Sequence, residues 1–161
     1  MGWKNILSIQ DTLFNGIYAN PLHINKTEKD LTIYSYQPIL EFRDVNSNQS
    51  RYWRLECMED KEGDDFLNPV EQETPYPLPY ESATGPYQDH IIEASSFLVQ
   101  NNRIKHVTGF GIKKDHLEYL SVIVLKLEEL YIIINPGGVI EITVTNNEPE
   151  INDEILFSTL K

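Results

Sequence analysis

Residues 120–145, LSVIVLKLEELYIIINPGGVIEITVT, are the most apolar stretch of the chain. β-Branched side chains are concentrated at residues 122–124 and 132–134. Branching at Cβ suits a pleated, half-buried surface. From residue 139 to residue 145 apolar and polar side chains alternate, which is typical of a strand with one face in water. The stretch therefore predicts three consecutive antiparallel strands at the centre of the fold.

The two turns within this stretch have different sequence support. Pro136 presets the φ angle of its turn, and a glycine after it can take the left-handed conformation that a bulged hairpin needs. Glu128 and Glu129 would form the other turn without any glycine. The alternative is an amphipathic helix over residues 118–130. The β-branched run favours strands over this helix.

The first twenty residues carry apolar side chains at helical spacing. These are Trp3, Ile6, Leu7, Leu13, Phe14, Ile17 and Tyr18. Polar residues lie between them, which predicts an amphipathic helix that ends at Asn20 and Pro21 and covers one face of the sheet. The alternative is a helix that binds a partner or a membrane surface. Its polar face is not rich in Lys or Arg, which disfavours the membrane.

Short strands are also predicted at residues 31–36, 39–43, 51–58, 91–99 and 103–112. The last two would form a hairpin around Asn101 and Asn102, because Asn tolerates the positive φ of tight turns. Near the C-terminus, Ile155, Leu156 and Leu160 suggest a short packing helix. The predicted fold class is α+β, with the N-terminal helix packed on a mainly antiparallel, meander-like sheet of about eight strands.

The length and composition are those of one domain. The 161 residues are enough for a sizeable core, and no domain boundary is visible. No apolar run approaches the roughly 20 residues of a membrane helix, and we expect no secretion signal. Cys57 is the only cysteine, which fits a cytoplasmic protein. It shares a strand face with Trp53 and Leu55, which predicts a small core residue rather than a nucleophile.

The formal net charge is −12. Such a surface repels phosphate backbones and anionic lipids, which disfavours nucleic acid and membranes as partners. A basic protein, a cation or simple solubility remain as explanations of the charge.

The acidic residues are unevenly distributed. Residues 56–73 hold eight acidic residues and one base, a net charge of −7, and five of the nine prolines lie in residues 69–88. We expect a long acidic and Pro/Tyr-rich loop at about residues 60–89, because proline removes backbone donors and long loops are usually functional or disordered. Residues 94–114 hold four bases and no acid. The acidic loop and this basic segment can face each other within the fold.

The candidate site combines these acids with tyrosines. Tyrosine supplies contact area with a polar tip, and nearby acids steer a basic partner. The candidate partner-binding residues are Glu59, Asp60, Glu62, Asp64, Asp65, Tyr76, Tyr80 and Tyr87. The alternative is that each tyrosine only anchors the loop to the domain's own surface.

The chain lacks the common catalytic and cofactor motifs. There is no GxSxG, P-loop or GxGxxG, so neither a catalytic residue nor a cofactor is predicted. Asp115, His116 and Glu118 lie close in the sequence, as do Asp89, His90 and Glu93, but neither group has the spacing of a known metal site. Residues 60–71 also fail the calcium-loop pattern, because the glycine falls at the fourth place instead of the sixth. No metal site is predicted.

The predicted function is a non-enzymatic, acidic protein-binding module with a basic partner. Its general character is similar to that of bacterial immunity proteins that neutralise a basic toxin, a similarity of character rather than of any motif. The alternative is a small-molecule-binding protein or an enzyme, with a pocket between the sheet and the long loop lined by Tyr76, Tyr80 and His90. A homo-oligomer formed through an exposed strand edge is a third hypothesis.

Overall fold

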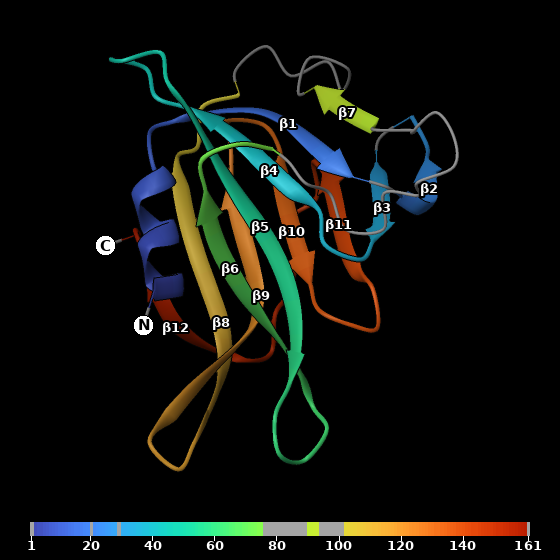
Figure 1. Cartoon of the computed structure of the whole chain (residues 1–161), viewed down its shortest axis with the longest axis vertical. Coiled ribbons are helices and arrows are strands. Elements are labelled where there is room, and N and C mark those ends of the chain that lie inside the picture. Colours follow the sequence, from blue (N-terminus) through green and yellow to red (C-terminus); the bar gives the residue numbers. More distant parts are fainter. Residues whose placement is uncertain (1, 20, 29, 76–89, 94–101, 161) are drawn as a thin grey trace.

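The computed structural model describes residues 2–19, 21–28, 30–75, 90–93 and 102–160, and shows two antiparallel sheets facing each other (Figure 1). One sheet has the strand order β6-β5-β4-β1-β7, and the other has the order β12-β8-β9-β10-β11-β3-β2. The elements are the 3-10 helix η1 (Gly2–Ile9) and the strands β1 (Leu13–Ala19), β2 (Pro21–Lys26), β3 (Leu31–Ser35), β4 (Ile39–Arg43), β5 (Ser50–Glu59), β6 (Asp65–Gln72), β7 (His90–Glu93), β8 (His106–Lys114), β9 (Leu117–Lys126), β10 (Tyr131–Asn135), β11 (Ile140–Thr145) and β12 (Glu154–Ser158).

The predicted α+β class is wrong, because the described residues form almost only strands. The amphipathic helix expected to run to Asn20 is absent from the described residues, and only the short 3-10 helix η1 packs at the N-terminus, where it buries Ile6 and Ile9. The 3-10 helix η1 ends at Ile9, Asp11 takes a φ of 68°, and β1 begins at Leu13. A β-bulge between Phe14 and Gly16 interrupts the alternation of β1. This irregularity gave the apolar residues of a strand a spacing that resembles a helix.

The central meander is confirmed. β9 pairs with β10 and β10 pairs with β11, both antiparallel, in the middle of the seven-stranded sheet. The Glu128 and Glu129 turn is also confirmed, and the Leu127 amide donates to the Leu130 carbonyl oxygen across it. The rival helix is excluded. Neither glycine after Pro136 takes a left-handed φ, contrary to the prediction.

The predicted hairpin around Asn101 and Asn102 is wrong in its pairing. β7 pairs with β1, whereas β8 pairs with β9 and β12, and residues 94–101 lie outside the described residues. Asp115 and His116 join β8 to β9 with φ angles of 50° and 66°. Two consecutive positive φ angles are the mark of a type I′ hairpin turn. The C-terminal segment expected as a helix is the strand β12.

The irregular segment expected from residue 60 is shorter than predicted. Residues 65–72 form β6, which pairs with β5 along its whole length. Pro69 lies within β6 and lacks an amide hydrogen, which is tolerated because β6 is an edge strand. Residues 76–89 are outside the described residues, so the remainder of this prediction stays a prediction.

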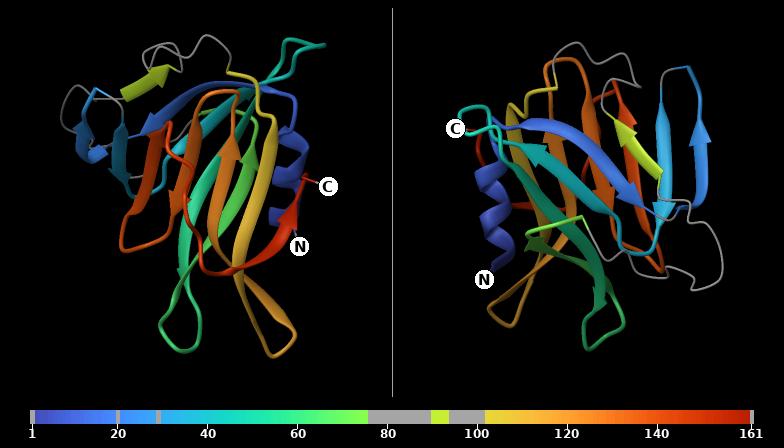
Figure 2. Two further views of the ribbon diagram at one scale, coloured as in Figure 1. Left: turned by 180° about the vertical axis from the view of Figure 1, so that it is seen from behind. Right: turned by 45° about the horizontal axis from the view of Figure 1, so that its top comes forward.

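The arrangement in space leaves two features exposed. The β5–β6 and β8–β9 hairpins project together from one end of the molecule (Figure 1). On the opposite side of the seven-stranded sheet from its partner sheet, residues 146–153 cross from β11 over the neighbouring strands to β12 at the edge (Figure 2). The first feature holds most of the candidate site residues, and the second forms part of a groove.

Close packing at Gly109 of β8 gives a test of the fold. A Cβ at this position would collide with the Phe157 ring and with Leu120 Cδ1. We expect Gly109→Ala to lower the free energy of unfolding by about 1–3 kcal/mol, the usual cost of overpacking. Gly138→Ala is the matched control, because a Cβ there meets nothing within 4 Å. Denaturant unfolding measures both, and equal stabilities of the two variants would contradict this packing.

Candidate functional site

The candidate site is the end of the molecule formed by the β5–β6 and β8–β9 hairpins, which we call the hairpin end. The tip of the β5–β6 hairpin is shaped by Asp60. Its Oδ1 accepts hydrogen bonds from the backbone amides of Glu62 and Asp64, at 2.9 and 3.0 Å. Gly63 supplies the positive φ of 84° that the turn requires. Asp60 thus has a structural task, and its side chain is only 5% exposed.

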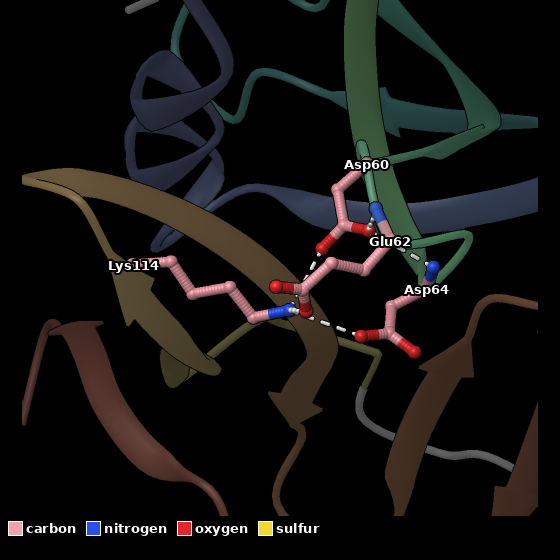
Figure 3. Close-up of polar contacts among 4 residues, drawn as sticks. All are labelled: Asp60, Glu62, Asp64 and Lys114. Carbon is pink, nitrogen blue, oxygen red and sulfur yellow. Dashed lines mark hydrogen bonds and ion pairs between the residues drawn. The ribbon is translucent and has the colours of Figure 1, made fainter.

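Lys114, the last residue of β8, joins the two hairpins. Its Nζ lies 3.0 Å from Asp60 Oδ2, 2.8 Å from Glu62 Oε2 and 3.0 Å from Asp64 Oδ2 (Figure 3). One ammonium therefore neutralises part of a three-carboxylate cluster and holds a tip of the five-stranded sheet against a tip of the seven-stranded sheet. This contact brings together the acidic and the basic segments of the sequence.

The ion pairs shift the pKa values of the partners in opposite directions. The Lys114 hydrogen bond, followed by the backbone amide of Asp64, lowers the pKa of Asp60. Hydrogen bonds to Glu62, Asp60 and Asp64 raise the pKa of Lys114. Both groups stay charged at neutral pH.

The same carboxylates are the right kind of ligand for a hard cation. Oxygen atoms of Asp60, Glu62 and Asp64 all lie within 4.8 Å of one another. Lys114 Nζ lies within hydrogen-bond distance of all three, where a cation would otherwise sit. The cluster is therefore explained by the chain's own lysine.

Two further acids of the candidate site have a different environment. Glu59 and Asp65 are exposed and lie directly opposite each other in the ladder between β5 and β6. Neither has a cationic partner among the residues that the structure describes. Like charges directly opposite each other destabilise a strand pair. The fold therefore keeps the Glu59 and Asp65 carboxylates opposite each other although they repel.

Apolar side chains surround the acids at the hairpin end. Phe66 of β6 and Tyr119 of β9 pack edge to face, with ring centroids 5.1 Å apart. Their ladder partners Met58 and Ile112 are both exposed, as is Leu117 at the start of β9. The hairpin end therefore exposes apolar side chains as well as carboxylates.

The remaining predicted site residues are not placed. Tyr76, Tyr80 and Tyr87 lie outside the described residues, and only the backbone of His90 is described, in β7. The pocket expected around them therefore stays a hypothesis. Sequence reasoning missed Lys114, although the run of bases without acids from residue 94 to residue 114 was the signal for it.

Other polar groups have structural explanations. The buried carboxylate of Glu41 accepts hydrogen bonds from Asn15 Nδ2, from the Tyr18 hydroxyl at 2.7 Å and from Ser50 Oγ at 2.9 Å. Burial raises the pKa of the Cys57 thiol, which disfavours the nucleophilic thiolate. Asp115 and His116, weighed above as metal ligands, form the β8–β9 turn.

Comparison of the chain with protein-family models, with curated proteins and with solved structures finds no match. None of the helical segments in the described part of the chain is long and apolar enough to span a lipid bilayer.

Lys114→Met keeps the aliphatic stem and removes the ammonium. We expect the pKa of Asp60 to rise toward 3.8, its ordinary value, because its main hydrogen-bond donor is lost. A carboxyl group with a lowered pKa stabilises the fold above its ordinary pKa and loses this effect as the pH falls through its folded-state pKa. Because the pKa of Lys114 is raised, Lys114 stays protonated and its contribution to the stability of the fold is fully present at neutral pH. The loss of stability in the variant is thus expected in full near neutral pH and should shrink below pH 3.8.

Denaturant unfolding at several pH values and a carboxyl titration by NMR measure these two effects. Lys113→Met, at the adjacent exposed position, is the control. A stability difference that persists unchanged in acid would contradict this account of Lys114.

Proposed function

We propose that this protein is a non-enzymatic binding module that recognises a basic protein through the hairpin end. An immunity-like role, in which an acidic protein neutralises a basic one, is the specific form that we favour. The net charge of −12 supports a basic partner, because long-range attraction speeds the encounter of oppositely charged proteins.

The observation that carries the proposal is the pair Glu59 and Asp65. Two exposed carboxylates face each other at a projecting strand pair, without a cationic partner in the described part of the chain. A lysine or arginine of a partner placed between them would replace repulsion by two ion pairs.

The Lys114 contact supports the proposal in a second way. It fixes the tip of one hairpin against the other, so that the surface is arranged before the partner arrives. Binding by a preorganised surface costs less conformational entropy than binding by mobile hairpins.

The repulsion can be tested without any partner. We expect Glu59→Gln combined with Asp65→Asn to raise the midpoint of thermal unfolding by about 1–3 °C, because opposed like charges are removed. Glu150→Gln combined with Glu154→Gln removes two exposed charges outside the hairpin end and is expected to have a smaller effect. Equal shifts for the two pairs would show that only the overall charge matters.

Binding is tested with the same two double variants, each immobilised and exposed to the native lysate at low and at high salt. We expect one basic protein to be retained by the wild type and by the Glu150/Glu154 variant, and to be lost from the Glu59/Asp65 variant. High salt should weaken the retention, because exposed charges are screened. Equal retention on all three proteins would place the binding surface elsewhere.

A further inference from the structure

A groove lies on the outer face of the seven-stranded sheet, separate from the hairpin end. Its volume is about 400 Å³, within the usual range for small-molecule sites. The floor includes Thr108 and Phe110 of β8 and Val124 of β9. Val124 alternates with the core residues Ile123 and Leu125, which places it on the opposite face of the strand.

The walls of the groove come from the segment that crosses the sheet and from the C-terminal strand. Pro149 belongs to the crossing segment, which Figure 2 shows passing over the outer face of the sheet. Ile155 and Leu160 line the other side and are 59% and 55% exposed. Two large apolar side chains left in water beside an apolar floor are typical of a binding site.

One end of the groove is basic. The cross-strand pairs His106–Lys126 and Lys126–Tyr131 bring these three side chains together on the outer face, and all three line the groove. His106 also lines an adjoining polar hollow with Lys105, Arg103 and Asp11, and Arg103 forms an ion pair with Asp11. Basic groups therefore gather here in a protein whose net charge is −12.

Two polar groups at this end lack a partner of opposite charge or a hydrogen-bond partner among the described residues. Lys126 has no carboxylate partner among the described residues; its Nζ lies 5.8 Å from the centroid of the Tyr131 ring. The Nδ1 atom of His106 is buried and has no hydrogen-bond partner in the same set of residues. Glu148 also lines the groove, but it is exposed and forms no ion pair with Lys126.

We propose that this groove binds a free amphipathic carboxylate, a small molecule with an apolar body and one anionic head. The apolar body lies over Phe110 and Val124, between Ile155 and Leu160. The carboxylate accepts a hydrogen bond from Lys126 Nζ. When the His106 side chain rotates toward the groove, its Nδ1 donates a second hydrogen bond to the same carboxylate. The acidic surface as a whole disfavours an anionic bilayer as the source of the ligand.

The probes are decanoate and decyltrimethylammonium, each below its micellar concentration, and decan-1-ol below its solubility limit. They share the apolar chain and differ in the charge of the head. Calorimetric titration is expected to show the highest affinity for decanoate, a lower affinity for decanol and the lowest for decyltrimethylammonium. In amide NMR spectra, decanoate should perturb His106, Thr108, Lys126 and Ile155 while leaving the hairpin end unchanged.

Lys126→Met distinguishes the contribution of the anionic head to binding from that of the apolar body. We expect decanoate to bind about tenfold more weakly, the effect of losing one charge-assisted hydrogen bond, and decanol to bind within about twofold of the wild type. Lys4→Met, outside the groove, is the matched control and should bind both probes as the wild type does.

Ile155→Asp places a charge beside the apolar floor and should weaken decanoate and decanol alike. Val45→Asp, at a similarly exposed position in the loop between β4 and β5, controls for an added charge. Three results would overturn the proposal: no binding of decanoate to the wild type, unchanged decanoate affinity of Lys126→Met, or a dimer in solution that covers the groove.

Discussion

Burial of one face of each sheet against the other is the constraint on which the rest of the structure depends. Trp53, Phe42 and Leu55 on the five-stranded sheet and Ile123 and Leu125 on the seven-stranded sheet belong to one core and are almost fully buried. Each large apolar side chain contributes roughly 1.5–3 kcal/mol when it leaves water. Because side chains alternate along a strand, shifting any of these strands by one residue would turn its apolar set into water. The core therefore fixes which side chains point outward.

The outward-facing side chains are of two kinds. At the hairpin end they are acidic with exposed apolar neighbours, whereas in the groove they are apolar with a basic end. Strand β8 connects the two sites, since His106 stands at its start and Lys114 at its end. The two bases have opposite roles: Lys114 is held by three carboxylates of its own chain, and His106 keeps an unpaired buried nitrogen.

The Lys114 contact differs from an ordinary surface ion pair. Isolated exposed pairs contribute little, because water screens them and two flexible side chains must be ordered. Here one ammonium meets three carboxylates, and Asp60 is already fixed by two backbone amides. The turn itself thus meets the ordering cost of Asp60, one of the three carboxylates. Lys114 links the ends of two sheets whose described strands do not pair with each other.

Local patterns in the sequence determined the strands that alternate without interruption. The central meander, β3, β4 and β5 follow from β-branched runs and from period-two alternation, and the net charge follows from composition alone. The acidic members of the candidate site were visible in the sequence as a charge run. The sequence did not show that Asp60 has a structural role while Glu59 and Asp65 lack a cationic partner among the described residues. This difference depends on a turn geometry and on a lysine about fifty residues away.

Only the tertiary structure decided the rest. The bulge in β1 gave a strand the apolar spacing of a helix, and β6 keeps a proline because it lies at an edge. Strand order, the pairing of β7 with β1 and the crossing of residues 146–153 to β12 arise from contacts between distant segments. The groove has the same origin, because its floor, walls and basic end come from segments that only the folded sheet brings together. A sequence specifies such contacts through the packing of the whole core, and no local pattern records them.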